Sequence, residues 1–363
     1  MSRVHHFVLI AAAWVGFGAS SAVSQVIEPP FNSAYVLSNL GSPPGVPTRF
    51  GGLTLKHDDP NVLLIGGSAN LADGAIYSIG VVRAGGHIVN FTGTAVVHTN
   101  APYNDGGVVY GPDNVLFLAR WPVNQLGQSI LNSGITNRVI DLAPFNVEAS
   151  LAALNFVPPN FPGAGDFKMV TYSGGQWLDV TIAPDGAGTY DVVNVTEIVA
   201  SRLPCGPEGF VYVPAGLPFF PTPSMLVAEY GCATIGAFEL DVDGNPRPET
   251  RRVFMTLLPG AEGAFIDPTT GDFLFSTFGG DNKVVVVRGF SAACSTCRGD
   301  LNVDNYTNGG DIQQFVTCYM QTGSPVGLCR CGDMDNNDHV GESDVPLFID
   351  KIMGTIDPDL QCP

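Results

Sequence analysis

The sequence predicts a mainly β protein, a five-bladed β-propeller over residues 31–290 followed by a small α-helical domain over residues 298–363. Composition is the first indication: of 363 residues, 44 are glycine and 28 are proline, and only 14% are charged. This balance is typical of many short strands joined by tight turns. The second indication is a loose repeat of four short strand-like segments, the pattern of propeller blades. Six blades, or a pair of β-sandwiches, are the alternatives.

The first 24 residues have the pattern of a secretory signal peptide. A short cationic start, MSRVHH, precedes the apolar run FVLIAAAWVGFGAS, and Ala22-Val23-Ser24 supplies small residues for cleavage before Gln25. An uncleaved anchor is the alternative, although the run is short for a bilayer span. We therefore expect a soluble protein that is secreted to the extracellular space or cell surface, with the periplasm as an alternative.

The formal net charge of −18 restricts the partners of the chain. The sequence offers no basic patch for the phosphates of nucleic acid, and an acidic surface does not favour anionic membranes. Outside the signal region, no apolar run approaches the length of a membrane span. Metal cations, in contrast, are favoured partners of such a surface.

Five blade openings align on a small residue. They are GGLTLKHDDP from Gly51, GGVVYGPDN from Gly106, LAALNFVPP from Leu151, EGFVYVPAG from Glu208 and EGAFIDPTTG from Glu262. Aligned on Gly52, Gly107, Ala153, Gly209 and Gly263, they are separated by 55, 46, 56 and 54 residues. The last unit stops after three strand-like segments. We expect AYVLSNL, at residues 34–40, to supply its fourth strand and close the ring, which removes open sheet edges.

This region resembles secreted bacterial propellers of the NHL and sugar-lactonase (SMP-30-like) families, through PEGFVY and AEGAFIDPTTGDFLFST. Sugar-lactonase relatives use a glutamate at such a blade opening as a metal ligand, so the resemblance implies that role for Glu208 and Glu262. The other ligands of that site are usually an Asn and an Asp, for which Asp105, Asn104 and Asp58 are candidates only. A Glu before Gly at a turn also has a purely structural explanation.

Two functions from different classes follow for the propeller. In the first it is a non-catalytic recognition platform, with a carbohydrate among its expected ligands and no catalytic residue assigned. In the second it is a metal-dependent hydrolase or lactonase of carbohydrate-derived substrates. Three or more oxygen ligands converging in the central channel would favour the enzyme, and a channel lined by apolar or unpaired residues would exclude it. The sequence has no Gly-x-Ser-x-Gly elbow, no His-Glu-x-x-His and no metal-ligand spacing among His57, His87 and His98.

Eight cysteines suit export to an oxidising compartment, where an even cluster indicates disulfides. Two lie in the propeller region, Cys205 and Cys232, and six lie near the C-terminus: Cys294, Cys297, Cys318, Cys329, Cys331 and Cys362. We expect Cys318 to pair with Cys329 across one short loop. A zinc site from Cys294, Cys297, Cys329 and Cys331 is the alternative, but it leaves two of the six unexplained. We interpret residues 291–297 as a linker into the second domain.

Two acidic segments 33 residues apart predict calcium loops. In DLNVDNYTNGGD, from Asp300, oxygen-bearing side chains fall at positions 1, 3, 5, 9 and 12, and in DMDNNDHVGESD, from Asp333, at positions 1, 3, 5 and 12. Calcium takes six to eight oxygens, position 7 contributes a backbone carbonyl, and position 9 commonly acts through water. We expect two Ca²⁺ ions. The predicted ligands are Asp300, Asn302, Asp304, Tyr306, Asn308 and Asp311 in the first loop, and Asp333, Asp335, Asn337, His339 and Asp344 in the second.

Each loop is followed by the pattern of a helix with one apolar face. The apolar residues are Ile312, Phe315, Val316, Tyr319 and Met320 after the first loop, and Val345, Phe348, Ile349, Ile352 and Met353 after the second. We expect the two faces to pack on each other. Because the clustered carboxylates repel one another, metal binding should be coupled to folding. Two polar turns before amphipathic helices are the alternative.

The pair of loops resembles a dockerin-type module (type I, EF-hand-related) over residues 298–354, with two calcium loops that each end in Asp before a helix. The resemblance implies calcium ligation by the residues named above and a docking partner such as a cohesin-like or cell-surface protein. The usual Gly at position 6 is replaced by Asn305 and Asp338. The partner-binding positions 10 and 11, often a Ser-Thr pair, hold Gly309-Gly310 and Glu342-Ser343. The sequence thus predicts a secreted calcium-binding protein with a propeller and a docking module.

Overall fold

The computed structural model describes residues 24–84, 86–289, 298–301, 306–320, 327–335, 337 and 339–353. The predicted signal peptide, apart from its last residue, and the predicted linker lie outside these ranges. So do Asn302, Asp304, Asn305, Asp338, Cys294, Cys297 and Cys362. Among the described residues, no helix has the length and apolar character needed to cross a membrane.

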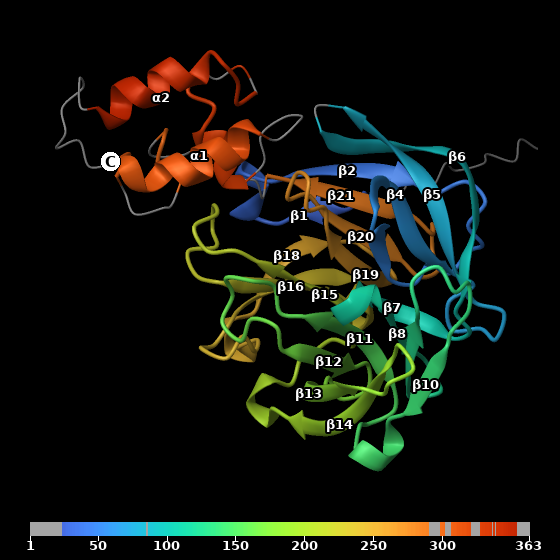
Figure 1. Ribbon diagram of the computed structural model, residues 1–363. Coiled ribbons are helices and arrows are strands. Elements are labelled where there is room, and N and C mark those ends of the chain that lie inside the picture. The colour runs from blue at the N-terminus through green and yellow to red at the C-terminus, as the bar shows by residue number, and fades with distance from the viewer. Residues whose placement is uncertain are drawn as a thin grey trace, which may run out of the picture.

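Five antiparallel sheets form the blades of a propeller (Figure 1). The first three blades contain β3 (Leu53–Lys56), β4 (Asp59–Gly67), β5 (Ala75–Ala84) and β6 (His87–Asn100); β7 (Asn104–Tyr110), β8 (Leu116–Arg120), β9 (Gln125–Ser129) and β10 (Arg138–Asp141); and β11 (Leu151–Phe156), β12 (Phe167–Thr171), β13 (Trp177–Pro184) and β14 (Tyr190–Glu197). The last two contain β15 (Pro207–Val213), β16 (Ser224–Glu229), β17 (Thr234–Glu239) and β18 (Arg252–Thr256); and β19 (Ala261–Ile266), β20 (Phe273–Thr277), β21 (Val284–Arg288) and β2 (Val36–Gly41). Short 3-10 helices lie in the connections: η1 (Phe31–Ser33), η2 (Pro112–Asn114), η3 (Ala143–Phe145), η4 (Val199–Ser201), η5 (Tyr230–Cys232) and η6 (Pro248–Thr250).

The strand β2 closes the ring. It pairs antiparallel with β21, so the last blade combines segments from both ends of the propeller. The predictions of five blades and of a closing strand near residues 34–40 are confirmed, and the six-bladed and β-sandwich alternatives are excluded. The repeat did not indicate β1 (Val26–Ile27), which pairs with β18 and gives the fourth blade a fifth strand.

Small residues at the aligned positions let the five innermost strands meet at the axis. A Cβ atom on Gly209 would lie 2.3 Å from the backbone nitrogen of Ala264, and one on Gly263 would lie 2.7 Å from the Cα of Gly52. A side chain does not fit at such distances, because another backbone occupies the space. The glycine repeat that predicts the blades is therefore a packing requirement of the axis.

Apolar side chains fill the spaces between neighbouring blades. Phe117 of the second blade and Phe167 of the third are both buried, with ring centroids 5.3 Å apart. Val211 and Val285 belong to a buried cluster shared by the fourth and fifth blades. Each such side chain contributes about 1.5–3 kcal/mol on burial. This packing fixes the blades, and with them the residues at the axis.

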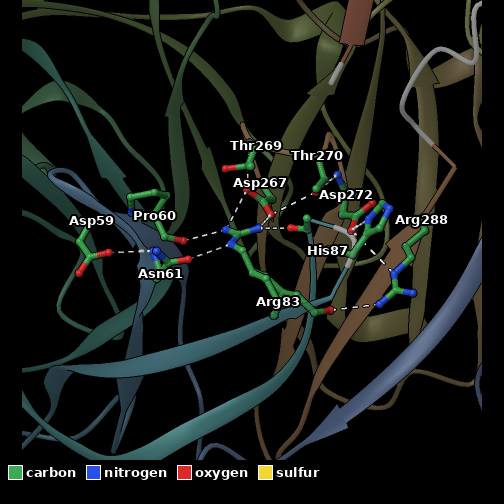
Figure 2. A network of polar contacts seen from close by, with 12 residues as sticks. Asp59, Pro60, Asn61, Arg83, His87, Asp267, Thr269, Thr270, Asp272 and Arg288 are labelled. Atoms are coloured by element: carbon green, nitrogen blue, oxygen red, sulfur yellow. Dashed lines mark hydrogen bonds and ion pairs between the residues drawn. The ribbon is translucent and has the colours of Figure 1, made fainter. Parts of the chain in front are cut away.

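A polar network joins the first and last blades (Figure 2). The guanidinium of Arg83, on β5, donates to both carboxylate oxygens of Asp267, at 2.6 and 3.3 Å. His87 Nδ1, at the start of β6, lies 2.6 Å from Asp272, and the Arg288 guanidinium lies 3.8 Å from the same carboxylate. Burial raises the pKa of Asp272, and the hydrogen bond from His87 partly opposes that rise. The network ties the β5–β6 hairpin to the turn between β19 and β20.

The described C-terminal residues form η7 (Gly309–Asp311), α1 (Ile312–Tyr319), η8 (Gly327–Cys331) and α2 (Asp344–Ile352). The rings of Phe315 and Phe348 stack with their centroids 4.0 Å apart. They lie in a small core that is completed by Leu301, Cys318, Cys329, Cys331 and Val340. The predicted helices are confirmed, and each contributes one phenylalanine to this core.

The two apolar faces pack on each other at Phe315 and Phe348, as expected, but much of each face is left uncovered. The loop and η8 residues of the core occupy the space beside the two phenylalanines, so the rest of each face remains outside. Val345 and Ile352 are partly buried. The exposed members are Ile312, Val316, Tyr319, Met320, Ile349 and Met353.

Two disulfides are present among the described residues. One joins Cys205 to Cys232 in the fourth blade, and the other joins Cys318 to Cys329 after α1. The expected Cys318–Cys329 pair is confirmed. Because Cys329 is bonded to Cys318, the zinc alternative, which needs the Cys329 thiolate, is excluded.

Candidate functional site

Three carboxylates from three blades meet at the axis of the propeller. Asp105 of β7, Glu208 of β15 and Glu262 of β19 each bring one oxygen within 4.8 Å of the others. The residues are 1%, 5% and 1% exposed, so the group is almost completely withdrawn from solvent. Each is the second residue of the innermost strand of its blade. The third blade has Ala152 at the equivalent place, which leaves room for the longer side chains.

The equivalence of Asp105 with the two glutamates is concealed in the sequence by a β-bulge. On β7 the pairing moves from Asn104↔Arg120 to Val108↔Leu118, whereas on β15 it moves from Pro207↔Glu229 to Phe210↔Val227. The inner strand of the second blade therefore carries one extra residue, Gly106. A Cβ at that place would make a tight contact, 3.1 Å from the backbone nitrogen of Gly209, which favours glycine. Alignment on the axial glycines consequently displaces Asp105 by one position.

Each of the three carboxyl groups has one oxygen that accepts no hydrogen bond from the described residues. Asp105 Oδ2, Glu208 Oε2 and Glu262 Oε1 are buried without a partner among the described residues. Within the described part of the chain, none of the three takes part in an ion pair. Asn70, with its amide nitrogen toward the axis, donates to Asp105 Oδ1 at 2.9 Å. Buried polar atoms in proteins nearly always have partners, so three unpartnered oxygens in one place mark this group as a candidate ligand site.

Burial and mutual repulsion disfavour the charged forms. Burial raises the pKa of Asp105 to about 7. Burial, followed by the negative charge of Asp105, raises the pKa of Glu208 well above its ordinary value. Burial, followed by the charges of Glu208 and Asp105, does the same for Glu262. A divalent cation would remove the repulsion and satisfy the unpartnered oxygens, and an all-oxygen donor set suits Ca²⁺, Mg²⁺ or Mn²⁺.

A cavity of about 190 Å³ opens onto the carboxylate group at Glu208 and Glu262. It is lined by Asn70, Trp121, Tyr172, Glu208, Tyr230, Glu262 and Phe278. Burial, followed by the carboxylate charges, raises the pKa values of Tyr172 and Tyr230. The aromatic residues were not identified from the sequence. The available signal was an aromatic residue directly after the second strand of four blades, in ARW, VTY, AEY and STF.

The residues considered for the propeller site have different outcomes. Glu208, Glu262 and Asp105 converge, which is the arrangement that favours the metal-dependent alternative. Asn104 is also buried; its amide nitrogen donates to the carbonyl of Ala101 at 3.0 Å, and its Oδ1 has no hydrogen-bond partner among the described residues. Asp58 is not part of the group, because it is exposed in the turn between β3 and β4 and pairs with Lys56.

The second acidic loop brings together part of its predicted ligand set. One oxygen each of Asp333, Asp335 and Asp344 lies within 4.8 Å of the others. Asp333 and Asp344 are buried. Asn337 is exposed, and its amide nitrogen donates to Asp335 at 2.9 Å. His339 is exposed and its backbone nitrogen donates to Asn337 Oδ1.

The two loops share a hydrogen-bond pattern at the predicted offset of 33 residues. Asp311 accepts from the backbone nitrogens of Leu301 at 2.7 Å and Asn308 at 2.9 Å. Asp344 accepts from those of Met334 at 2.6 Å and Gly341 at 2.8 Å. Asp300 is buried and Tyr306 exposed, and two predicted ligands of this loop, Asn302 and Asp304, lie outside the described residues. The predicted partner-binding residues are all exposed: Gly309, Gly310, Glu342 and Ser343.

Comparisons with known proteins add little to this geometry. No family model matches the chain, and no curated protein matches it. Among solved structures, a 6-phosphogluconolactonase described as a putative one, from Bacteroides uniformis, is similar with 14% identity over 64% of this chain and 66% of that chain, at a TM-score of 0.36. An auxiliary nutrient binding protein from Bacteroides ovatus is 10% identical over 70% and 76% of the two chains, at a TM-score of 0.40. The PQQ domain of a pyranose dehydrogenase from Coprinopsis cinerea is 8% identical over 73% and 97%, at 0.42. Likenesses of this size carry no information on activity or ligand.

Proposed function

We propose that the propeller is a divalent-cation-dependent hydrolase of carbohydrate-derived lactones. Asp105, Glu208 and Glu262 would hold the cation. One observation carries the proposal: three buried carboxylates from separate blades converge at the end of a cavity, with an unpartnered oxygen on each. A purely structural role does not explain this group. Without a cation, the burial and mutual repulsion of three carboxyl groups destabilise the fold.

The residues of the pocket divide the work of such a reaction. A bound divalent cation would supply an electrophile that polarises a substrate carbonyl and lowers the pKa of water. The carboxylates bind and position that charge, and Asn70 orients Asp105 through the hydrogen bond at 2.9 Å. The aromatic walls exclude bulk water, which strengthens electrostatic interactions inside the pocket. Calcium takes six to eight oxygens, and three carboxylates supply at most six, so the ligand set has room for substrate or water.

For the C-terminal region we propose a calcium-dependent docking module with two ions. Support comes from the converging oxygens of Asp333, Asp335 and Asp344 and from the matching hydrogen bonds of the two loops. Exposed apolar residues on α1 and α2, such as Val316 and Ile349, offer a surface for a partner. A cohesin-like or cell-surface protein is the partner we propose. Two disulfides and a signal-like N-terminus support an extracellular or periplasmic location.

Calcium titration of the mature chain by calorimetry tests both proposals in one experiment. We expect three binding events for the wild type and two for Glu208→Gln/Glu262→Gln, because the axial site is removed. Asp333→Asn/Asp344→Asn should also lose one event, from the second loop. With D-glucono-1,5-lactone and Ca²⁺, Mg²⁺ or Mn²⁺, the axial variant should lose activity by about 100-fold or more, since it lacks the electrophilic centre.

Glu249→Gln is the matched control, because Glu249 is 64% exposed and pairs with Arg247 on the surface. It should retain all three binding events and full activity. If the axial variant still binds three ions, the carboxylate group is not a metal site. If it loses an ion but the wild type hydrolyses no lactone with any of these cations, the propeller is a recognition platform.

A further inference from the structure

The aromatic residues of the axial cavity occupy one repeated position. Trp121, Tyr172, Tyr230 and Phe278 each directly follow the second strand of a blade, namely β8, β12, β16 and β20. We call these four residues the aromatic crown. In the first blade the same position, after β4, holds Ser68. Each of four blades therefore places one aromatic side chain at the same level along the axis, and the first blade does not.

The same backbone contact fixes each residue of the crown. Their backbone nitrogens donate to the carbonyl of the residue just before the innermost strand of the same blade. The pairs are Trp121 to Tyr103 at 2.9 Å, Tyr172 to Ser150 at 3.0 Å, Tyr230 to Gly206 at 3.0 Å and Phe278 to Gly260 at 2.7 Å. The carboxylate or alanine of the axial level follows two residues after each acceptor. In each of these four blades, the crown residue is therefore hydrogen-bonded two residues before the axial position. This fixes the crown relative to the acidic group.

The rings of the crown also contact each other. Tyr172 and Tyr230 have centroids 6.0 Å apart with nearly perpendicular planes, and Tyr230 and Phe278 lie 6.2 Å apart in a similar arrangement. Such edge-to-face pairs are favourable and keep the rings in place. All four rings are part-exposed and line the cavity together with Glu208 and Glu262. The crown therefore forms the wall above the carboxylates.

The lining restricts the chemistry of a ligand. Among the described residues no lysine, arginine or histidine lines the cavity, so its walls offer an anionic substituent no positively charged side chain. Aromatic walls take a ligand with an apolar face, and their electron-rich faces attract the polarised C–H groups of a saturated ring. At about 190 Å³ the cavity is smaller than the roughly 300–1,000 Å³ of drug-sized sites, which limits the occupant to one ring. The polar side is the first blade, where Asn70 lines the cavity.

We propose that the aromatic crown is the substrate subsite and that it binds a single uncharged sugar-derived ring, with the C–H face of the ring against the aromatic walls and its oxygens toward the axial carboxylates and their cation. This inference rests on the proposed function, because an oxygen-rich ring is attracted to this end of the cavity only through a bound cation. It assigns substrate contact to Trp121, Tyr172, Tyr230 and Phe278, none of which is a metal ligand.

Binding of 1,5-anhydro-D-glucitol, a sugar ring without a hydrolysable bond, tests the inference on the mature, calcium-saturated chain. Trp121 is the part-exposed one of the two tryptophans in the described residues, since Trp177 is fully buried. We therefore expect saturable quenching of its fluorescence. By calorimetry, Trp121→Ala and Tyr230→Ala should each weaken ring binding by several-fold to about tenfold. Calcium affinity at the axial site should stay within about twofold.

Phe219→Ala is the control, because Phe219 is an exposed aromatic residue that packs against Phe31 and does not line the cavity. It should leave ring binding unchanged. Crown variants that bind the ring as well as the wild type, or a wild type that does not bind it, would overturn the inference while the axial calcium event persists. If the wild type shows no calcium binding at the axial site, the proposed function itself fails. Tetramethylammonium in EDTA is the test of an organic cation as the ligand. If it binds more tightly than the sugar ring binds in calcium, the inference is overturned, and the aromatic crown is a site for an organic cation.

Discussion

Glu262 illustrates how a single buried residue affects both stability and binding. Its carboxylate lies beside two others, and one of its oxygens has no partner among the described residues. Without a cation this arrangement raises the free energy of the folded state. We predict that Glu262→Gln stabilises the metal-free protein by roughly 1–3 kcal/mol, the cost of an unsatisfied buried polar group. With calcium at 1,000 times the dissociation constant of the axial site the order should reverse, because binding at that site adds about 4.1 kcal/mol to the wild type alone.

Differential scanning calorimetry in EDTA and in calcium measures both effects. The exposed Glu249→Gln variant should match the wild type in both conditions. A Glu262→Gln protein that is less stable than the wild type in EDTA as well as in calcium would show that the carboxylates form a structural network that needs no ion.

The sequence repeat directly indicates two of the three carboxylates at the axis. Glu208 and Glu262 share a Glu-Gly pair that the repeat makes visible. Asp105 was one of several candidates, because the extra residue in the β7 bulge displaces it from the aligned position. The aromatic crown follows the second strand of each blade, whereas the alignment used the first strand, so its regularity was missed. A bulge changes pairing without changing composition, and only the strand register reveals it.

Among the elements, the Cys205–Cys232 disulfide holds two parts of the pocket together. It joins the segment before β15 to η5, where Gly231 donates to the carbonyl of Cys205 at 2.8 Å. Glu208 and Tyr230 lie within three residues of the bonded cysteines. The disulfide spans 27 residues, and the chain-entropy estimate for such a loop is about 3.5 kcal/mol.

We predict that Cys205→Ser/Cys232→Ser lowers the free energy of unfolding by about that amount and weakens calcium binding at the axial site. Loss of the link lets the segments carrying Glu208 and Tyr230 move independently. Urea unfolding and calcium calorimetry measure the two effects. Cys318→Ser/Cys329→Ser removes the other described disulfide and should leave axial calcium affinity unchanged. Equal calcium affinity in the two double variants would contradict a positioning role for Cys205–Cys232.

The spacing of apolar residues predicts the two helices but not all of their packing partners. The spacing of apolar residues predicted α1 and α2 correctly, and Phe315 stacks on Phe348 as an apolar face requires. The same spacing cannot indicate that Cys318, Cys329 and residues of the loops fill the remaining core. Periodicity identifies a face that could be buried, but the partner of that face depends on residues distant in the sequence.

In the whole molecule, closure of the ring depends on contacts between its first and last blades. The closing strand β2 was predictable, because the last repeat lacks one strand. The polar network of Figure 2 was not, since Arg83 and Asp267 are 184 residues apart and belong to no repeated motif. Side-chain exposure is 13% for Arg83 and 0% for Asp267. Removing one partner of such a buried pair leaves the other charge without compensation.

We predict that Arg83→Met destabilises the propeller by about 3–5 kcal/mol, and that Arg83→Met/Asp267→Leu recovers most of this loss, because apolar replacement of both partners removes the uncompensated charge. Urea unfolding followed by tryptophan fluorescence is a suitable measurement, since Trp121 and Trp177 both lie in the propeller. Lys56→Met breaks the exposed pair with Asp58 and should change stability by less than about 1 kcal/mol. A double variant as unstable as Arg83→Met would mean that the seam needs the hydrogen bonds of Arg83 to neighbouring carbonyls more than it needs charge compensation. An Arg83→Met protein as stable as the Lys56→Met control would mean that β2 pairing and apolar packing close the ring unaided.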